Sequence, residues 1–121
     1  MNTWLGDPSR VVFLEAILET VKRDNLIEMN QQSGKILLDG LKEYCKQYPH
    51  LVENARGLGT FCAYDGVDVA TRDQIYAKLR NVGVHSGPSG HRSMRLRPSL
   101  LFTPKHAELF LHKLGQVLAS M

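Results

Sequence analysis

The segment from Ser93 to Arg97 alternates polar and apolar residues and therefore predicts a β-strand. Successive side chains of a strand point to opposite faces, so Met94 and Leu96 would face the core while Arg95 and Arg97 emerge together on the other face. Two guanidinium groups held this close repel each other, and their planar forks of donors match carboxylates. The strand is either a carboxylate-binding strand or a solvated edge strand whose arginines discourage aggregation.

Helical periodicity dominates the rest of the chain. Asp7-Pro8 is a helix-start signal, Asp24-Asn25 offers a break and a new cap, and Thr103-Pro104 starts a last helix. Pro49 and Gly83 are stop signals at the ends of two further apolar stripes. The spacing of apolar residues predicts four helices, over 8–22, 26–48, 71–81 and 104–121.

Short extended patterns lie between these helices. Residues 52–56 and 60–65 flank Gly57-Leu58-Gly59, which predicts a hairpin or a sharply bent strand pair. Val84-His85 is predicted as a short strand and residues 86–90 as the loop that leads to the arginine strand. A small, mostly antiparallel sheet covered on one face by helices is the simplest packing, so the predicted fold class is α+β.

Length and composition indicate one modest domain. The chain has 121 residues, of which 43% are hydrophobic and 22% are charged, as in an ordinary globular protein. Its formal net charge of +3 is spread along the chain, so we do not expect a nucleic-acid partner. Charged and polar residues interrupt every apolar stretch before it could span a membrane, and the N-terminus does not read as a signal peptide.

The chain offers no convincing catalytic or metal-binding set. Cys45 and Cys62 form no Cys-x-x-Cys pair and are predicted to be buried free thiols in a reducing compartment. His106 and His112 are six residues apart, which puts them on different faces of one helix, so no metal site is expected. The lysines fall mainly on helical patterns, where solvated faces are their expected positions.

The segment from Asn2 to Pro8 is open to two interpretations. A hydroxyl group, a glycine and a helix N-terminus together can hold an anion such as phosphate. The same residue types are also those that any loop before a helix uses.

Three separated motifs together resemble the class III pyridoxal-phosphate-dependent aminotransferases, and most closely their 4-aminobutyrate aminotransferase group. The resemblance covers essentially the whole chain. The motifs are Asn2-Thr3-Trp4-Leu5-Gly6-Asp7-Pro8, Arg56-Gly57-Leu58-Gly59-Thr60-Phe61-Cys62 and Ser93-Met94-Arg95-Leu96-Arg97-Pro98-Ser99-Leu100.

This resemblance implies a homodimeric enzyme of fold type I. Residues 1–23 would be an interface loop and connecting helix, and residues 24–121 the small C-terminal α+β domain. Members of the group transfer an ω-amino group from 4-aminobutyrate to 2-oxoglutarate through pyridoxal 5'-phosphate held on a lysine. The implied location is the mitochondrial matrix, although the chain contains no targeting segment.

The resemblance also implies roles for three residues. Thr3 corresponds to a threonine at the dimer interface that contacts the cofactor phosphate of the neighbouring subunit. Arg95 corresponds to an arginine that faces the active site and serves carboxylate recognition, and it can pair with an active-site glutamate. Arg97 is expected to support Arg95 structurally or electrostatically.

The cofactor machinery of the family is not matched in this chain. The Schiff-base lysine, the acid that pairs with the pyridine nitrogen and the aromatic residue that stacks on the ring belong to an upstream domain, which would bind most of the cofactor. We therefore expect a fragment that is inactive alone and contains no catalytic residue. The alternatives are a fragment of lysine 6-aminotransferase or another ω-aminotransferase, or a non-catalytic α+β module that associates through its first helix.

Overall fold

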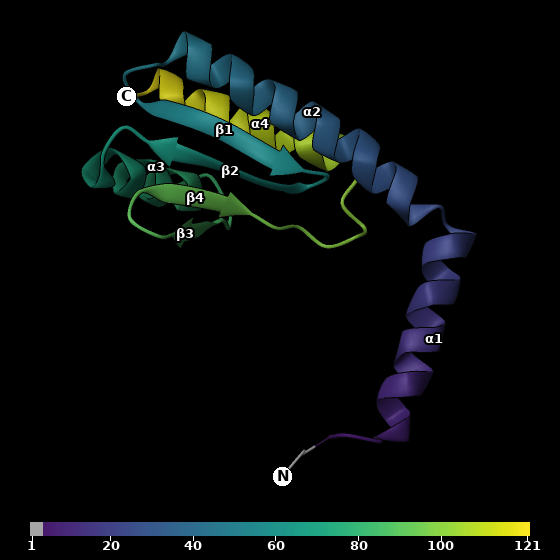
Figure 1. The fold of residues 1–121 in the computed structure, drawn as a ribbon. Coiled ribbons are helices and arrows are strands. Elements are labelled where there is room, and N and C mark those ends of the chain that lie inside the picture. The colour runs from purple at the N-terminus through teal and green to yellow at the C-terminus, as the bar shows by residue number, and fades with distance from the viewer. Residues whose placement is uncertain (1–3) are drawn as a thin grey trace.

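The computed structural model describes residues 4–121, which form four helices and a four-stranded sheet (Figure 1). This confirms the predicted α+β class. The elements are α1 (Pro8–Arg23), α2 (Leu26–Gln47), β1 (Val52–Leu58), β2 (Phe61–Gly66), α3 (Val69–Asn81), β3 (Gly87–Ser89), β4 (Ser93–Leu96) and α4 (Pro104–Ala119).

The helix ends follow most of the sequence signals. The Asp7 carboxylate accepts a hydrogen bond from the Ser9 backbone N–H at 3.0 Å, which confirms the predicted cap of α1. A break at Asp24-Asn25 is also confirmed, but Asn25 does not cap α2 with its side chain. Its backbone adopts a left-handed conformation with φ of 50°, and its amide donates to the Glu28 carboxylate instead.

The strands pair in the order β1-β2-β4-β3, and every pair is antiparallel. The hairpin predicted around residues 57–59 is confirmed, with Leu58 opposite Phe61 at its end. The strand predicted at Val84-His85 is wrong. Because the Val84 N–H donates to the Leu79 carbonyl at the end of α3, it is not available to a strand ladder, and pairing begins only at Gly87.

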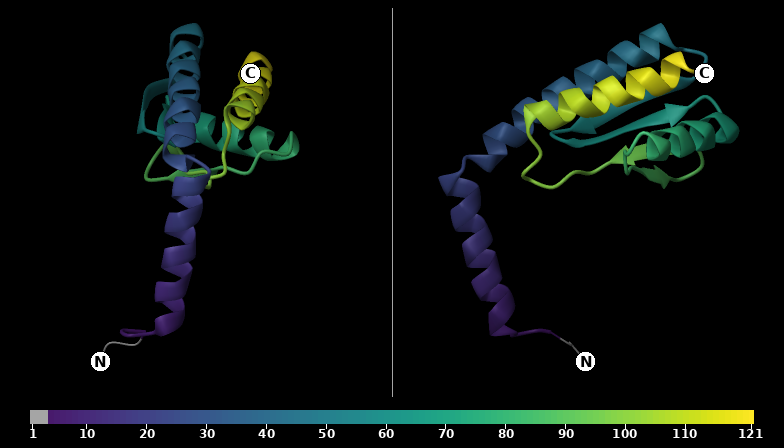
Figure 2. Two further views of the ribbon diagram at one scale, coloured as in Figure 1. Left: turned by 90° about the vertical axis from the view of Figure 1, so that its right-hand side faces the viewer. Right: turned by 180° about the vertical axis from the view of Figure 1, so that it is seen from behind.

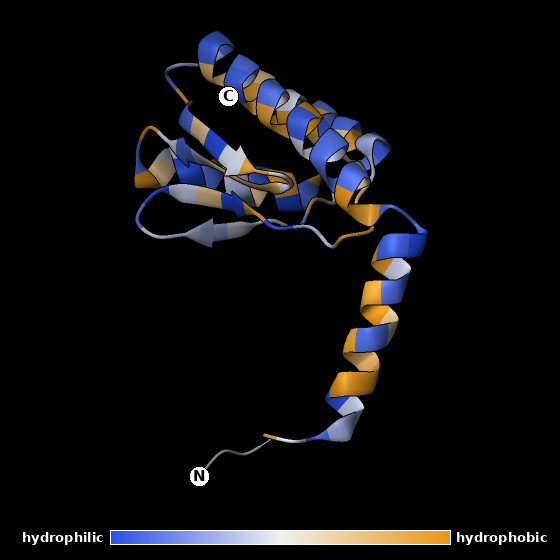
Figure 3. Cartoon of the chain, turned by 45° about the vertical axis from the view of Figure 1, so that its right-hand side comes forward, coloured by the Kyte–Doolittle hydropathy of each residue, from blue (hydrophilic) through white to orange (hydrophobic). Residues whose placement is uncertain are grey.

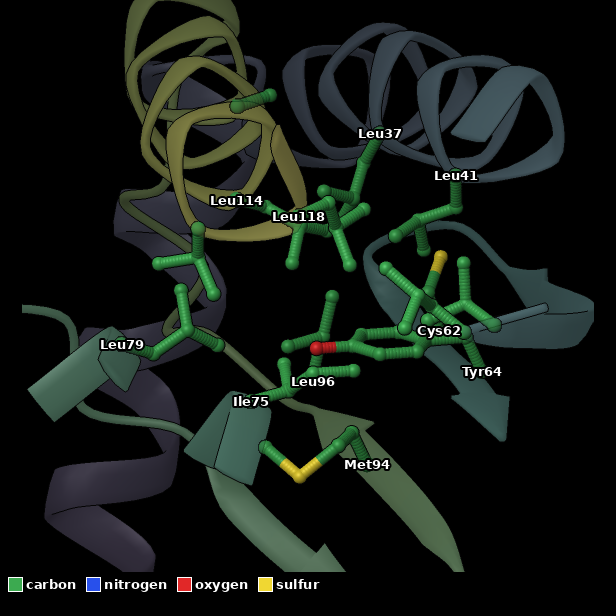
Figure 4. Packing of buried hydrophobic residues seen from close by; sticks show 14 residues of the cluster. Leu37, Leu41, Cys62, Tyr64, Ile75, Leu79, Met94, Leu96, Leu114 and Leu118 are labelled. Atoms are coloured by element: carbon green, nitrogen blue, oxygen red, sulfur yellow. The ribbon is translucent and has the colours of Figure 1, made fainter. Parts of the chain in front are cut away.

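The core lies between one face of the sheet and α2, α3 and α4. Figure 4 shows Tyr64 and Met94 of the sheet meeting leucine and isoleucine side chains of the three helices. Both strand residues are at most 1% exposed, as are Leu37, Ile75 and Leu114. Helices α2 and α4 lie side by side along this side of the sheet (Figures 1 and 2). The predicted cover of helices on one face of the sheet is therefore confirmed.

Helix α2 and the β1–β2 hairpin come into backbone contact at two glycines. A Cβ atom placed on Gly34 would lie 2.1 Å from the carbonyl carbon and oxygen of Gly59. Gly59 itself turns the hairpin with a φ of 56°, a conformation that L side chains rarely adopt. Hydrogen bonding supports the same contact, because the Asn30 amide donates to the Thr60 hydroxyl at 2.7 Å. The hairpin can therefore approach α2 this closely only because residues 34 and 59 have no side chains.

Helix α1 contributes no buried residue and extends away from the sheet (Figures 1 and 2). Its apolar side chains remain exposed, including Phe13 at 68% and Val11 at 65%. In Figure 3 this helix carries apolar bands over much of its length. No helix within residues 4–121 combines the length and the apolar character needed to cross a membrane.

Candidate functional site

The arginine strand has the orientation predicted from its sequence. Met94 and Leu96 are buried against the helices, whereas Arg95 and Arg97 are exposed. Strand β4 ends at Leu96, so Arg97 lies one residue beyond the ladder. Arg95 pairs with Ala63 of β2 on one side and with Gly87 of β3 on the other, which places it in the interior of the sheet. The alternative of a solvated edge strand is therefore wrong for β4, because β3 covers its outer edge.

Both arginines line one cavity of about 270 Å³ between the end of the sheet and the helices. Its polar lining also includes His85 and Ser86, from the segment that follows α3. Apolar walls come from other elements, with Leu37 from α2, Phe110 from α4, and Phe102 from the loop before α4. We call this space the arginine cavity. It combines two cations with an apolar wall, which suits a small molecule that carries a carboxylate.

A second cavity, of about 350 Å³, lies on the outer face of the sheet and shares Arg95 with the first. Leu58 and Phe61 at the end of the hairpin form its apolar part and are 88% and 55% exposed. Arg56 and Ser93 contribute polar groups to it. Arg95 thus contributes to the lining of both cavities.

The neighbouring arginines already have acidic partners. Arg56 donates to the Asp65 carboxylate at 3.0 Å, and Arg92 pairs with Glu53. Arg72 pairs with Asp73 at the start of α3. Within residues 4–121, by contrast, neither arginine of the arginine cavity forms an ion pair. Of these five arginines, Arg95 and Arg97 therefore remain available to an external anion.

Asp65 organises the polar network beside Arg95. Its carboxylate accepts hydrogen bonds from the Ser93 hydroxyl at 2.6 Å, the Arg56 guanidinium at 3.0 Å and the Asn54 amide at 3.2 Å. Burial opposes ionisation of this carboxyl, but the three hydrogen bonds and the charge of Arg56 outweigh burial and lower its pKa below the usual value. Asp65 therefore neutralises Arg56 and holds the Ser93 hydroxyl in place. Ser93 lies two positions before Arg95 in β4.

Replacing Asp65 with Asn should destabilise the fold and flatten its acid dependence. A carboxyl whose pKa is lower in the folded state contributes stability above its unfolded pKa, and this contribution is lost as pH falls through the folded pKa. We expect Asp65→Asn to cost about 1–3 kcal/mol at pH 7, since three hydrogen-bond donors lose a charged and buried acceptor. Urea unfolding at pH 7 and at pH 3 measures both effects. The exposed Asp39, which pairs with Lys35 on the surface of α2, provides the control Asp39→Asn, and equal effects of the two variants would contradict this role of Asp65.

Of the remaining predicted features, Cys62 lines the second cavity, which it shares with Arg95. Thr3 lies outside the residues that the structure describes. Cys62 is buried, whereas Cys45 is only half-buried, and both thiols are free. Burial was thus predicted correctly for one cysteine and wrongly for the other, because Cys45 sits at the margin of the core. Within residues 4–121 no group of histidine, cysteine and acidic side chains could hold a metal ion.

Comparison with known proteins identifies the family. The family model described as aminotransferase class-III matches residues 1–118. The chain belongs to this family. Mitochondrial 4-aminobutyrate aminotransferase of Sus scrofa is 41% identical over 98% of the chain, and 4-aminobutyrate aminotransferase of Dictyostelium discoideum is 38% identical over 99%. The chain spans 24% of the length of each of these relatives.

Solved structures of two aminotransferases have the same fold. Lysine aminotransferase from M. tuberculosis superposes with a TM-score of 0.81 and 29% identity, covering 86% of this chain and 24% of that one. Acetylornithine aminotransferase from Elizabethkingia anophelis gives a TM-score of 0.81 at 19% identity, covering 88% of this chain and 28% of that one. The second likeness shows the fold alone.

For this class III chain, the sequence pointed to the two arginines but not to the residues around them. The alternation that places Arg95 outward also places Phe61 and Asp65 of β2 on the same outer face, so part of the network was within reach of the period-two pattern. The helix and loop residues of the arginine cavity gave no local signal. Phe102 and Phe110 reach the arginine cavity only because α4 and the loop before it pack against the rest of the fold.

Proposed function

We propose that this chain forms part of a 4-aminobutyrate:2-oxoglutarate aminotransferase and that Arg95 binds the substrate carboxylate. The observation that carries the proposal is the charge arrangement of the site, in which Arg95 lines two cavities and has no acidic partner within residues 4–121. The relatives named above, at 38–41% identity, are named for 4-aminobutyrate, and the family resemblance of the three motifs implies 2-oxoglutarate as the amino acceptor. A bidentate guanidinium is suited to a carboxylate common to the amino acid and the 2-oxo acid.

The residues of this chain do not fit pyridoxal phosphate by themselves. All lysines of residues 4–121 lie on helices, and none lines either cavity that contains Arg95. A Schiff base needs a lysine beside the reacting carbonyl group. We propose that the cofactor is held mainly by parts of the protein outside this chain, and that Thr3 contacts the cofactor phosphate of a neighbouring subunit.

The exposed apolar side of α1 supports an association role for the first part of the chain. Phe13 and Ile17 are 68% and 54% exposed although they lie in a regular helix. Exposed apolar surface of this kind marks contact with another protein part. We propose that residues 1–23 are an interface loop and connecting helix of a homodimer, that residues 24–121 form the small domain, and that the mitochondrial matrix is the site of action.

A hybrid enzyme tests the proposed reaction. In it, this chain replaces the matching quarter of the pig enzyme, and transamination of 2-oxoglutarate is measured with 4-aminobutyrate and with lysine as amino donors. We expect at least a 10-fold higher kcat/KM for 4-aminobutyrate, which corresponds to about 1.4 kcal/mol of transition-state discrimination. A preference for lysine would favour the lysine 6-aminotransferase alternative. A folded, cofactor-loaded hybrid without transamination would favour the non-catalytic module.

A further inference from the structure

The loop of residues 97–102, between β4 and α4, forms part of the arginine cavity without belonging to a helix or a strand (Figure 1). It begins with Arg97, directly after β4, and ends with Phe102, and both residues line the cavity. Leu100 and Leu101 in the middle of the loop are 41% and 63% exposed. The shape of this side of the cavity therefore depends on what holds the loop against the rest of the fold.

Ser33 of α2 provides the connection. Its hydroxyl lies 3.1 Å from the Phe102 carbonyl oxygen and 2.8 Å from the carbonyl oxygen of Met29, one turn earlier in α2, and it can donate its proton to either. Within residues 4–121 no other hydrogen bond joins the loop to a different element, since the remaining one runs from the Phe102 N–H to the Ser99 carbonyl inside the loop. Ser33 is fully buried, so water does not compete for its hydroxyl.

The same side of α2 also contacts the β1–β2 hairpin. The Asn30 amide donates to the Thr60 hydroxyl, and Gly34 allows the close approach of the hairpin backbone. Residues 30, 33 and 34 are three or four positions apart at most, so they share one side of the helix. The hairpin is in addition held by its own strand ladder, whereas the loop has no ladder. The loss of one hydrogen bond to α2 should therefore affect the loop much more than the hairpin.

Packing of Phe102 does not replace this hydrogen bond. The Phe102 side chain packs against the core, and its ring centroid lies 5.6 Å from that of His106. Apolar contact is non-directional, so it keeps the ring inside without fixing the backbone that carries it. A hydrogen bond has a preferred length and angle, and it fixes the Phe102 carbonyl relative to α2.

We propose that Ser33 is a positioning residue for the proposed reaction: by holding the Phe102 carbonyl it fixes the loop of residues 97–102, and with it one wall of the arginine cavity. Ser33 does not line this cavity itself, so it acts through Phe102. The consequence for substrate binding rests on the proposed function. The consequence for the loop needs neither cofactor nor turnover.

Backbone order parameters from NMR relaxation test the role in the loop, on this chain alone. In Ser33→Ala the order parameters of residues 99–102 should fall from about 0.85 to below about 0.6, while those of residues 57–61 in the hairpin should stay near about 0.85. Ser33→Cys retains a weak donor and should give intermediate values. Ser120→Ala is the matched control, because the Ser120 hydroxyl donates to the Val117 carbonyl of its own helix, away from the loop.

Kinetics of the hybrid enzyme test the role in substrate binding. A displaced wall weakens binding of the substrate and of the transition state alike, which raises KM and leaves kcat nearly unchanged. We expect Ser33→Ala to raise KM for 4-aminobutyrate and for 2-oxoglutarate about 3- to 10-fold, the effect of one net hydrogen bond, and to change kcat by less than about 2-fold. Ser120→Ala should change neither constant.

Two results would overturn the proposal. The first is a loop that stays as rigid in Ser33→Ala as in the unsubstituted chain. The second is a mobile loop with unchanged KM values, which is the behaviour of a residue that only stabilises the fold. A hybrid that lacks transamination before any substitution would contradict the proposed function instead, and the order parameters would still decide whether Ser33 holds the loop.

Discussion

Gly34→Ala should be among the most destabilising single-methyl changes in this chain, with a loss of about 2–4 kcal/mol in the free energy of unfolding. The added Cβ would lie 2.1 Å from the carbonyl carbon and oxygen of Gly59, and backbone atoms cannot rotate out of its way. To relieve the clash, the β1–β2 hairpin would have to move away from α2. This displacement would also break the hydrogen bond from the Asn30 amide to the Thr60 hydroxyl. Urea unfolding followed by circular dichroism measures the loss.

Gly40→Ala is the matched control for this prediction, because it makes the same change in the same helix. A Cβ on Gly40 would first meet the end of the Leu111 side chain, which can change its rotamer. Replacing an interior helix glycine with alanine also favours the helix by about 1 kcal/mol. We therefore expect Gly40→Ala to lie within about 1 kcal/mol of the unsubstituted chain. Equal destabilisation of the two variants would contradict the backbone contact between α2 and the hairpin.

Much of the fold was predictable because local signals and tertiary packing agree. Asp7-Pro8 and Thr103-Pro104 start helices in the structure as their sequence predicts, and His106 completes a capping box with Thr103. The pattern of alternating residues gave the correct inward and outward faces of β4. Each of these features depends on residues within one turn or one strand, which is the range over which propensity and periodicity operate.

The predictions that failed concern segments whose structure is decided by tertiary contacts. β3 consists of Gly87, Pro88 and Ser89, residues that are typical of a loop, and it is a strand only because β4 supplies partners for its backbone. Proline is tolerated there because β3 lies at the edge of the sheet. Val84, with the better strand propensity, is held instead by the end of α3.

The candidate site shows the same division. Its two arginines could be found from their spacing, because the alternation decides that they face away from the core. That these two arginines lack acidic partners could not be predicted from the sequence. It depends on the folded structure, in which Asp65 pairs with Arg56 and Glu53 pairs with Arg92. The apolar wall of the arginine cavity could not be predicted either, because α2 and α4 reach it only after the chain has folded.

Arg95→Gln should produce the largest functional effect in the hybrid enzyme. A neutral amide cannot replace a charged, bidentate donor, and a lost hydrogen bond to a charged group costs about 1.5–3 kcal/mol. We therefore expect kcat/KM to fall about 10- to 100-fold for both 4-aminobutyrate and 2-oxoglutarate. Arg95→Lys keeps the charge without the fork, so it should raise KM for both substrates by a smaller factor.

Arg80 provides the matched control for this change. It is exposed on α3, where its guanidinium donates to the Tyr76 hydroxyl at 3.1 Å, and it lines neither cavity that contains Arg95. Arg80→Gln and Arg80→Lys should leave the kinetics of the hybrid unchanged. They control for the loss of one positive charge and for the handling of the variant proteins.

The most direct test of Arg95 as the carboxylate-binding residue is the KM for 4-aminobutyrate and for 2-oxoglutarate, measured side by side in the Arg95→Lys and Arg80→Lys hybrids. We predict that Arg95→Lys raises both KM values and that Arg80→Lys raises neither. Unchanged KM values in Arg95→Lys would contradict the assignment and remove Arg95 from the substrate site.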